Sequence, residues 1–542
     1  MRLTMLMLAG MGSTVLAQTP PPAPPAPHSE MAGMSHGGAA GMSHGGAAGM
    51  SHGDMAVSKT AMIMPGYGMG GFPVTTKVPR AQAFFDNGMQ LAHAFAHKAA
   101  IKAMDEAVRL DPACAMCLWG LAWASGPTIN YGKSEDELAA LAAMTERAVA
   151  LAAKDATPRE RAMIDALQLR YAGDDKELGA LNFAKAMHVL SAREPADNEL
   201  AVLAADAWLE TAAKRSEEGK LNAEIAMTLL EPVLKRDPDY TPAIHFYIHA
   251  SELAGVPALA EPYADRLAGL APRASHLVHM PSHTYYWVGR YQDAADANMK
   301  AVALGIENAK ALGLGPPDGV WGLPYHAHNV TFGLGGALEA GDAKTALYLG
   351  RPLVERSQGR GDAGAYSQLI AANGYFAMAR FAPVTEVLAL KQPKLPFLKG
   401  AWHYARGEAF ARNGDAVGVR SEAAAIRGVR GPKSKDDATA QAQDLLFIAR
   451  EVLAGRAAMM GGRPGEAEVA FRQAAELQES DDFSAMADPP AWYYPVRRDL
   501  AAALLASGDR AGARTEAEAA LDYRKKDPGT LALLASLDPP LR

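Results

Sequence analysis

The sequence predicts an all-α protein whose body, residues 81–542, is a right-handed α-solenoid of repeated helix pairs. Hydrophobic residues make up 49% of the chain, Ala dominates, and runs of Val, Ile and Thr are scarce, a composition that favours helices. The length of 542 residues exceeds what one compact core supports and suits a stacked array. A turn signature also recurs, in which a small residue is followed by a charged or aromatic residue and then by Ala. It occurs as GRYQDA at 289–294, AGDAKTA at 340–346, NGDAVG at 413–418, GGRPGEA at 461–467 and SGDRAGA at 507–513.

Residues 1–17 have the pattern of a secretory signal peptide. Arg2 supplies the positive charge, Leu3–Leu16 forms a short apolar region, and Val15 and Ala17 supply the small residues of a cleavage site. A transmembrane anchor needs about 20 apolar residues, which is more than this stretch contains. We therefore expect a mature protein that is periplasmic or secreted and has no membrane span.

Residues 18–80 are predicted to form a disordered tail, which is Pro-rich at first and then rich in Met, His and Gly. The eight-residue unit GMSHGGAA recurs almost three times, and its composition does not support a packed core. A plain flexible linker is the alternative, but a linker has no need of oxidisable Met, and thioether with imidazole is a pairing suited to copper. We expect this tail to capture copper for the body through Met34, His36, Met42, His44, Met50 and His52.

Charge and motif content exclude several classes of function. The net charge of −7 is mild and no basic block appears, so we expect no nucleic-acid partner. The sequence has no Ser/His/Asp order, no glycine-rich phosphate loop and no dinucleotide fingerprint.

The repeated turn resembles that of the tetratricopeptide repeat (TPR), a helix–turn–helix unit of about 34 residues with a late Pro. The segments LDPACAMC at 110–117 and RDPDYTP at 236–242 carry that late Asp-Pro, and the units that start at Thr241 and Ser275 are 34 residues apart. In this family, fixed positions of the first helix of each unit line a concave groove. The resemblance implies that six histidines occupy such positions in three consecutive repeats, with His93 of the first unit as a further candidate. The six are His245, His249, His276, His279, His283 and His328.

The same histidines follow the helical period and therefore predict a metal site. His276, His279 and His283 fall within a wedge of about 60°, and His245 and His249 stand four residues apart on one helix face. Buried imidazoles without partners cost a few kcal/mol each, so we expect a metallated groove; a wet groove that binds an acidic peptide is the alternative. Pro281 should kink the helix, which would let the three clustered histidines serve two metals.

The metal is predicted to be copper, with zinc as the alternative. Six imidazoles suit a pair of copper ions with three imidazoles each, and the Met/His tail favours copper over zinc. For zinc, Glu252 would be a further ligand or a general base. His97 and His326 are weaker ligand candidates, and Tyr285 and Tyr325 are candidate catalytic residues near the cluster.

Cys114 and Cys117 are the two cysteines of the chain, at a CxxC spacing. In an exported protein they predict a disulfide or a soft-metal pair, although a bridge between residues one turn apart within a helix would be strained. The whole chain also resembles a group of exported bacterial TPR proteins. The matching segments are His279–His283 (HMPSH), Tyr325–Asn329 (YHAHN) and Trp492–Arg497 (WYYPVR). The last segment either caps the end of the solenoid core or closes a groove.

The function predicted from these features is that of a copper-dependent oxidoreductase that oxidises or oxygenates a small organic substrate. The alternatives are a periplasmic copper carrier or buffer without catalysis, a zinc-dependent hydrolase, and a protein-interaction scaffold that holds a peptide in the concave groove. The sequence supports a defined metal cofactor better than bulk storage, because storage would favour more Met and Cys ligands than the body offers.

Overall fold

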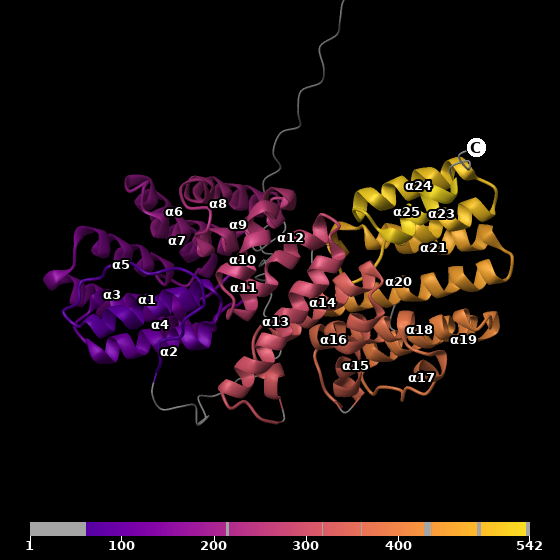
Figure 1. Cartoon of the computed structure of the whole chain (residues 1–542), viewed down its shortest axis with the longest axis horizontal. Helices are drawn as coiled ribbons and strands as arrows, with labels where there is room; N and C mark the ends of the chain where they lie inside the picture. Colours follow the sequence, from indigo (N-terminus) through magenta and orange to yellow (C-terminus); the bar gives the residue numbers. More distant parts are fainter. Residues whose placement is uncertain are drawn as a thin grey trace, which may run out of the picture. The chain divides into compact units, whose positions relative to one another are not determined.

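The computed structural model describes residues 61–537 apart from 213–215, 317, 359, 428–433, 435 and 485–488. In this part of the chain the regular elements are helices, as predicted, and Thr128 and Tyr131 form one isolated β-bridge (Figure 1). The predicted signal peptide and most of the predicted Met/His tail fall in residues 1–60, outside the described residues. The helices are α1 (Pro79–His93), α2 (His97–Leu110), α3 (Ala115–Ala124), α4 (Glu135–Asp155), α5 (Pro158–Arg170), α6 (Lys176–Arg193), α7 (Asn198–Thr211), α8 (Glu217–Arg236), α9 (Thr241–Leu253), η1 (Pro257–Ala260), α10 (Glu261–Leu270), α11 (Ser275–His279), α12 (Pro281–Trp287), α13 (Tyr291–Ala311), η2 (Gly319–Gly322), α14 (His326–Ala340), α15 (Ala343–Gln358), α16 (Ala365–Phe381), α17 (Val384–Leu388), α18 (Pro396–Arg412), α19 (Ala416–Ala425), α20 (Asp437–Met460), α21 (Pro464–Gln478), α22 (Asp481–Ser484), α23 (Arg497–Ala506), α24 (Arg510–Tyr523) and α25 (Pro528–Leu537).

The helices pack as consecutive pairs, among them α1 with α2, α13 with α14 and α20 with α21. Every predicted turn contains a glycine with a positive φ, a conformation that glycine adopts at little cost. These glycines are Gly289, Gly341, Gly414, Gly462 and Gly508. The turn signature therefore marks helix ends, as the sequence predicted.

Two hydrophobic cores fill the described part of the chain. The first is built from residues 67–294 together with Tyr325, and the second from residues 295–537. The segment Trp492–Tyr494 belongs to the second core, where Trp492 packs edge-on against Phe376 and Tyr404. The aromatic WYYPVR segment thus has the packing role that was one of its two predicted roles.

An extended segment, residues 61–78, lies against the helical body; we call it the strap. The predicted tail ended at residue 80, and this boundary is wrong for the strap. Met64 and Asn87 exchange two hydrogen bonds of 2.9 Å, and the backbone N–H of Met69 donates to Thr241 Oγ1 at 2.7 Å. The side chains of Tyr67 and Phe72 are buried. Ala61, Met64, Val74 and Val78 are partly buried against the first hydrophobic core.

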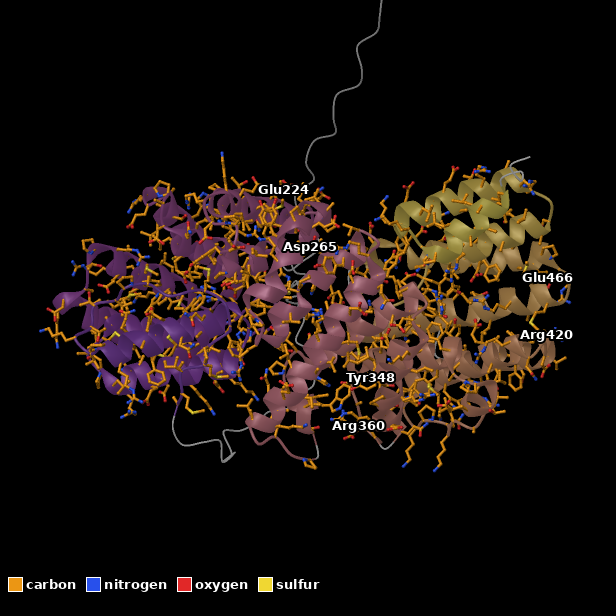
Figure 2. All side chains as sticks on the ribbon, in the orientation of Figure 1. Glu224, Asp265, Tyr348, Arg360, Arg420 and Glu466 are labelled. Atoms are coloured by element: carbon orange, nitrogen blue, oxygen red, sulfur yellow. A yellow bond between two sulfur atoms is a disulfide. The ribbon has the colours of Figure 1, made fainter. Side chains whose placement is uncertain are left out.

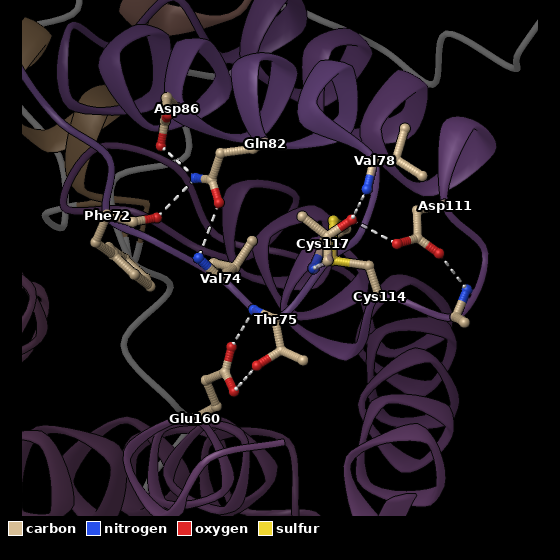
Figure 3. The surroundings of a disulfide bond; sticks show 12 residues. Phe72, Val74, Thr75, Val78, Gln82, Asp86, Asp111, Cys114, Cys117 and Glu160 are labelled. Atoms are coloured by element: carbon tan, nitrogen blue, oxygen red, sulfur yellow. Dashed lines mark hydrogen bonds between the residues drawn. A yellow bond between two sulfur atoms is a disulfide. The ribbon is translucent and has the colours of Figure 1, made fainter. Parts of the chain in front are cut away.

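The strap also contacts the region of the cysteines (Figure 3). Thr75 donates to the carboxylate of Glu160 through its N–H at 2.6 Å and its hydroxyl at 2.7 Å. Cys114 and Cys117 form a disulfide, one of the two predicted outcomes. Cys114 is the N-cap of α3 and has an extended backbone conformation. The expectation of a strained bridge assumed that both cysteines lie within one helical turn, and this assumption is wrong for Cys114. Among the described residues, no helix combines the length and the apolar character needed to cross a membrane.

Candidate metal centre

Three segments bring six imidazoles together: α9 carries His245 and His249, the α11–α12 segment carries three more, and α14 carries His328. The segment is divided at Met280 between α11, which ends at His279, and α12, which begins at Pro281, although Met280 itself keeps helical backbone angles (φ −50°, ψ −38°). Among the described residues, the imidazole nitrogens fall into two groups of three, each with all ligand atoms within 4.8 Å of one another. The division between the groups lies between His276 and His279, three residues apart on the short helix α11.

The first group, His245, His249 and His276, is the α9 group. The Nε2 atoms of His245 and His276 lie 3.1 Å apart, and the ring centroids of His245 and His249 are 5.1 Å apart. His249 Nε2 and His276 Nδ1 are buried and have no hydrogen-bond partner. Two buried nitrogen atoms without partners are costly in a folded protein, unless a bound group satisfies them.

The second group, His279, His283 and His328, is the α14 group. The Nε2 atoms of His279 and His283 lie 3.0 Å apart. The ring of His328 lies 4.6 Å from that of His279 and 5.5 Å from that of His283, measured between centroids. The nitrogens of two ligands on one tetrahedral ion are about 3.3 Å apart, which is close to the spacing of both Nε2 pairs.

Partners outside the two groups determine which nitrogens carry protons. His245 Nδ1 donates to the carbonyl oxygen of His93 at 2.7 Å. His279 Nδ1 donates to Asn298 Oδ1 at 2.7 Å, and Asn298 is oriented by its own amide N–H, which donates to the carbonyl oxygen of Ala294 at 2.8 Å. Because these acceptors have no proton to give, each Nδ1 carries the proton and each Nε2 of a neutral ring presents a lone pair. This is the arrangement that orients histidine ligands of metals in proteins.

His283 has a charged outer partner. Its Nδ1 donates to Glu252 Oε2 at 2.7 Å, and Glu252 Oε1 accepts from Trp287 Nε1 at 2.7 Å. The predicted candidate Glu252 therefore contacts the centre, and in this arrangement it orients an imidazole. Together with His249 and His283, it also forms a third set of potential ligand atoms within 4.8 Å of one another.

Burial favours the neutral form of four of the six imidazoles. Desolvation, with the neighbouring histidines as a further cause, holds the pKa values of His245, His276 and His279 well below the usual range for histidine. Desolvation also lowers the pKa of His249 to about 3. Of the six side chains His328 is half-buried, whereas the other five are buried. Neutral imidazoles are the form that binds metal ions, so the environment favours ligation.

Aromatic rings enclose the two groups. Phe95 lies 4.5 Å from His245 and 4.8 Å from His276, and Phe332 lies 4.3 Å from His283, all between ring centroids. Tyr325, one of the two candidate catalytic tyrosines, lies 4.4 Å from His276. Its hydroxyl is 3.3 Å from His97 Nε2, and desolvation raises the pKa of Tyr325 well above its usual value. The centre is therefore surrounded by apolar surface with one phenol at its edge.

Four residues that the sequence associated with the cluster lie outside the two groups. His93 Nε2 contacts Glu199 at 2.7 Å, and the His93 backbone carbonyl rather than its ring reaches the α9 group. His97 contacts Tyr325 instead of an imidazole nitrogen. His326 packs edge-on against Trp321, as its angular offset from His328 on the helix allows. Tyr285 donates to Asp265 at 2.7 Å, and Asp265 is labelled in Figure 2.

Asn298 and Trp287 were not predicted as parts of the centre. Trp287 is four residues after His283, so helical spacing could have placed both on one face. Asn298 lies in the middle of α13, and its sequence context resembles that of any polar helix residue. Its role depends on how α13 packs against α11, which the sequence does not reveal.

Comparisons with known proteins bear on the fold. No family model matches the chain, and no curated protein matches it. One solved structure that matches is the APC/C hetero-tetramer Cut9–Hcn1, with a TM-score of 0.32 and 13% identity over 85% of this chain and 76% of that one. Yeast Tom70 matches with a TM-score of 0.33 and 14% identity over 85% of this chain and 96% of that one. The TPR domain of P58(IPK) matches with a TM-score of 0.22 and 11% identity over 84% of this chain and 97% of that one. The last of these is a TPR domain by name, and at such identities the similarity to all three is one of helical architecture alone.

Proposed function

We propose that the protein binds a pair of copper ions, one in the α9 group and one in the α14 group, and uses them to oxidise a small substrate. One observation carries this proposal. His279 Nε2 and His283 Nε2 lie 3.0 Å apart, while the Nδ1 atoms of the two rings donate to Asn298 and Glu252. Neither nitrogen has a proton for the other. A metal ion bound by both lone pairs removes this repulsion.

The donor set supports a reactive pair of ions over a closed structural site. Structural metal sites in proteins are filled by four protein ligands, whereas catalytic sites have three and leave a position for water or substrate. Each group here offers three imidazoles. The two groups also contact each other, because the ring centroids of His276 and His279 are 5.5 Å apart and those of His249 and His283 are 5.4 Å apart.

Copper is favoured over other ions by ligand chemistry. Imidazole suits copper and zinc, and copper binds more tightly at a given nitrogen site. The sequence of the tail, with Met two residues before His in each repeated unit, adds the soft donors that copper prefers. When bound, copper would supply the redox step, while the residues of this chain hold the ions, exclude water and place the Tyr325 phenol beside His276.

A carrier and a scaffold are the competing functions. A carrier would hold copper in the same groups without reacting with an oxidant. The helical-repeat architecture supports a protein-interaction scaffold, because solenoids present extended binding surfaces. A scaffold function leaves the six clustered imidazoles and their oriented outer partners without a role.

The decisive experiment is metal analysis of the protein isolated from its native compartment, followed by absorption spectroscopy under dioxygen. The proposal expects two copper ions per chain and an absorption band that depends on oxygen. Bound copper without that response would identify a carrier. Zinc alone would favour a hydrolase, and a metal-free protein would favour the scaffold.

Two variants test whether the described groups hold the metal. His245→Ala and His279→Ala each remove an imidazole with an oriented Nε2, and each should reduce the copper content. The matched control is His188→Ala, because the His188 ring accepts a hydrogen bond from Trp208 at 3.1 Å, outside the two groups. Equal copper in all three variants would contradict the assignment.

The predicted role of the tail can be tested separately. Deleting residues 28–55 should slow copper loading when copper is limiting, because a tethered ligand raises the local concentration of the ion. The final copper content should not change. Identical loading rates for the full chain and the deletion variant would rule out capture by the tail.

A further inference from the structure

The two trihistidine groups are linked by a third set of potential ligands that overlaps both. This set consists of His249, Glu252 and His283, with ligand atoms within 4.8 Å of one another. His249 belongs also to the α9 group, and His283 to the α14 group. The third set differs chemically from the other two because it includes a carboxylate.

The contacts of the three residues favour a site in this position. Glu252 Oε2 lies 2.7 Å from His283 Nδ1, and Glu252 Oε1 is held by Trp287 Nε1 at 2.7 Å. His249 Nε2 is buried without a partner, and the His249 ring lies 5.4 Å from the His283 ring. Two imidazoles and one glutamate, with water in the fourth position, form a ligand set that zinc adopts.

We propose that His249, Glu252 and His283 form a third metal position, which binds a single zinc ion and whose occupation excludes the copper pair. This inference adds a second metal state to the proposed function and relies on that function only for the copper pair. Zinc would take the Nδ1 lone pair of His283 once the proton of that ring moves to Nε2, where it can be donated to His279 Nε2 at 3.0 Å, and would take its oxygen ligand from Glu252.

Exclusion follows from the sharing of ligands. One nitrogen lone pair binds one ion, so His249 Nε2 serves either the zinc position or the α9 group. In the zinc state the neutral His283 ring carries its proton on Nε2, so this nitrogen has no lone pair to offer to a copper ion in the α14 group. The chain would therefore hold one zinc ion or two copper ions, and the identity of the ion sets the stoichiometry.

The test is metal counting on the full chain after chelation, dialysed against zinc alone or copper alone. We expect one zinc or two copper ions per chain. Titrating copper into the zinc-loaded protein should release that one zinc ion, because copper is favoured at imidazole sites. Copper binding with zinc retained would overturn the exclusion, and two zinc ions per chain would overturn the assignment of a single position.

Two variants should shift metal preference in opposite directions. Glu252→Gln removes the oxygen ligand of zinc but keeps an acceptor for His283 Nδ1, so zinc affinity should fall by at least about tenfold more than copper affinity. The double variant His276→Ala/His328→Ala should lose copper and keep one zinc. Equal losses of both metals in Glu252→Gln would overturn the proposal.

The control for Glu252→Gln is Glu422→Gln. Glu422 Oε2 accepts from His403 Nδ1 at 2.6 Å, so it forms the same type of carboxylate–imidazole pair away from the centre. The Glu422→Gln variant should bind the same number of zinc ions and the same number of copper ions per chain as the wild type. If the wild-type chain binds one zinc ion but no copper, the proposed copper function fails while the zinc position stands.

Discussion

His279 Nε2 and His283 Nε2 lie 3.0 Å apart, and the Nδ1 atom of each ring already donates a hydrogen bond elsewhere. The two rings therefore repel each other when both are neutral and no ion lies between them. In the α9 group the corresponding contact is less strained, because His276 Nδ1 has no partner and Nε2 of His276 can carry the proton that His245 Nε2 accepts. The α14 group thus has the stronger need for a cation.

The first prediction is that copper increases the free energy of unfolding of the wild-type protein. The increase should be smaller in the His279→Ala variant. A ligand present at one hundred times its Kd adds about 2.7 kcal/mol to the free energy of unfolding. Chemical denaturation with and without copper measures the difference, and a chelator should reverse it.

His188→Ala should gain as much stability from copper as the wild type does. If His279→Ala gains the same amount as well, the α14 group is not where copper binds.

The second prediction concerns the strap. Gly70 has φ +142°, and a Cβ there would lie 3.0 Å from His93 Cδ2 and 3.2 Å from the backbone nitrogen of Gln90. Gly70→Ala should therefore destabilise the fold by about 1–3 kcal/mol. Because the carbonyl of His93 orients His245, copper affinity in the α9 group should fall as well.

Thermal unfolding and copper titration of Gly70→Ala measure these two effects. Gly132→Ala is the control, since a Cβ at Gly132 meets no atom within 4 Å. A Gly70→Ala protein as stable as the control would show that the strap does not hold α1 in place.

The periodic features of the sequence predicted most of the fold and much of the centre. The turn glycines recur with the repeats, and the histidines of α9 and α11–α12 follow helical spacing, so both could be recognised without a structure. The assignment of His276 to the α9 group could not, because it depends on how α9 packs against the α11–α12 segment; the break at Pro281 lies between His279 and His283, which share a group. The strap was predicted as disordered because glycine-rich composition is typical of disorder, and its few anchors, such as Tyr67 and Phe72, bind a surface formed by distant residues.

The third prediction concerns Glu339, on the same helix as His328. Burial raises the pKa of Glu339 to about 8, although Arg524 Nε, 3.1 Å from Oε1, acts in the opposite direction. Asp527, which is paired with Arg498 at 3.0 Å, and the Tyr286 hydroxyl complete the polar groups around it. The folded state therefore binds a proton that the unfolded state has lost above its ordinary pKa.

The direction in which stability changes with pH follows from this difference in proton binding. Between pH 6.5 and 8 the Glu339 carboxyl binds more protons in the folded than in the unfolded state, so its own contribution to stability falls as pH rises, by at most about 1.4 kcal/mol per pH unit. The histidines whose pKa values are lowered act in the opposite direction, because in the unfolded state they still bind protons near pH 6.5. Denaturation of the metal-free wild type and of Glu339→Gln across this range isolates the carboxyl, and stability should rise more steeply with pH in Glu339→Gln. A slope unchanged by that substitution would assign the effect to another group.

The last prediction separates the disulfide from the metal centre. Cys114 and Cys117 are bonded, and both are buried at the start of α3, in the first hydrophobic core. For so short a loop, the loss of unfolded-state entropy corresponds to about 2 kcal/mol of stability. The double variant Cys114→Ser/Cys117→Ser should therefore unfold at lower denaturant concentration by about that free energy or less. Its copper and zinc content should equal that of the wild type, because the sulfur atoms are bonded to each other and not available as ligands. Loss of a copper ion from this variant, with the fold intact by circular dichroism, would instead identify the cysteines as the soft-metal pair that the sequence also allowed.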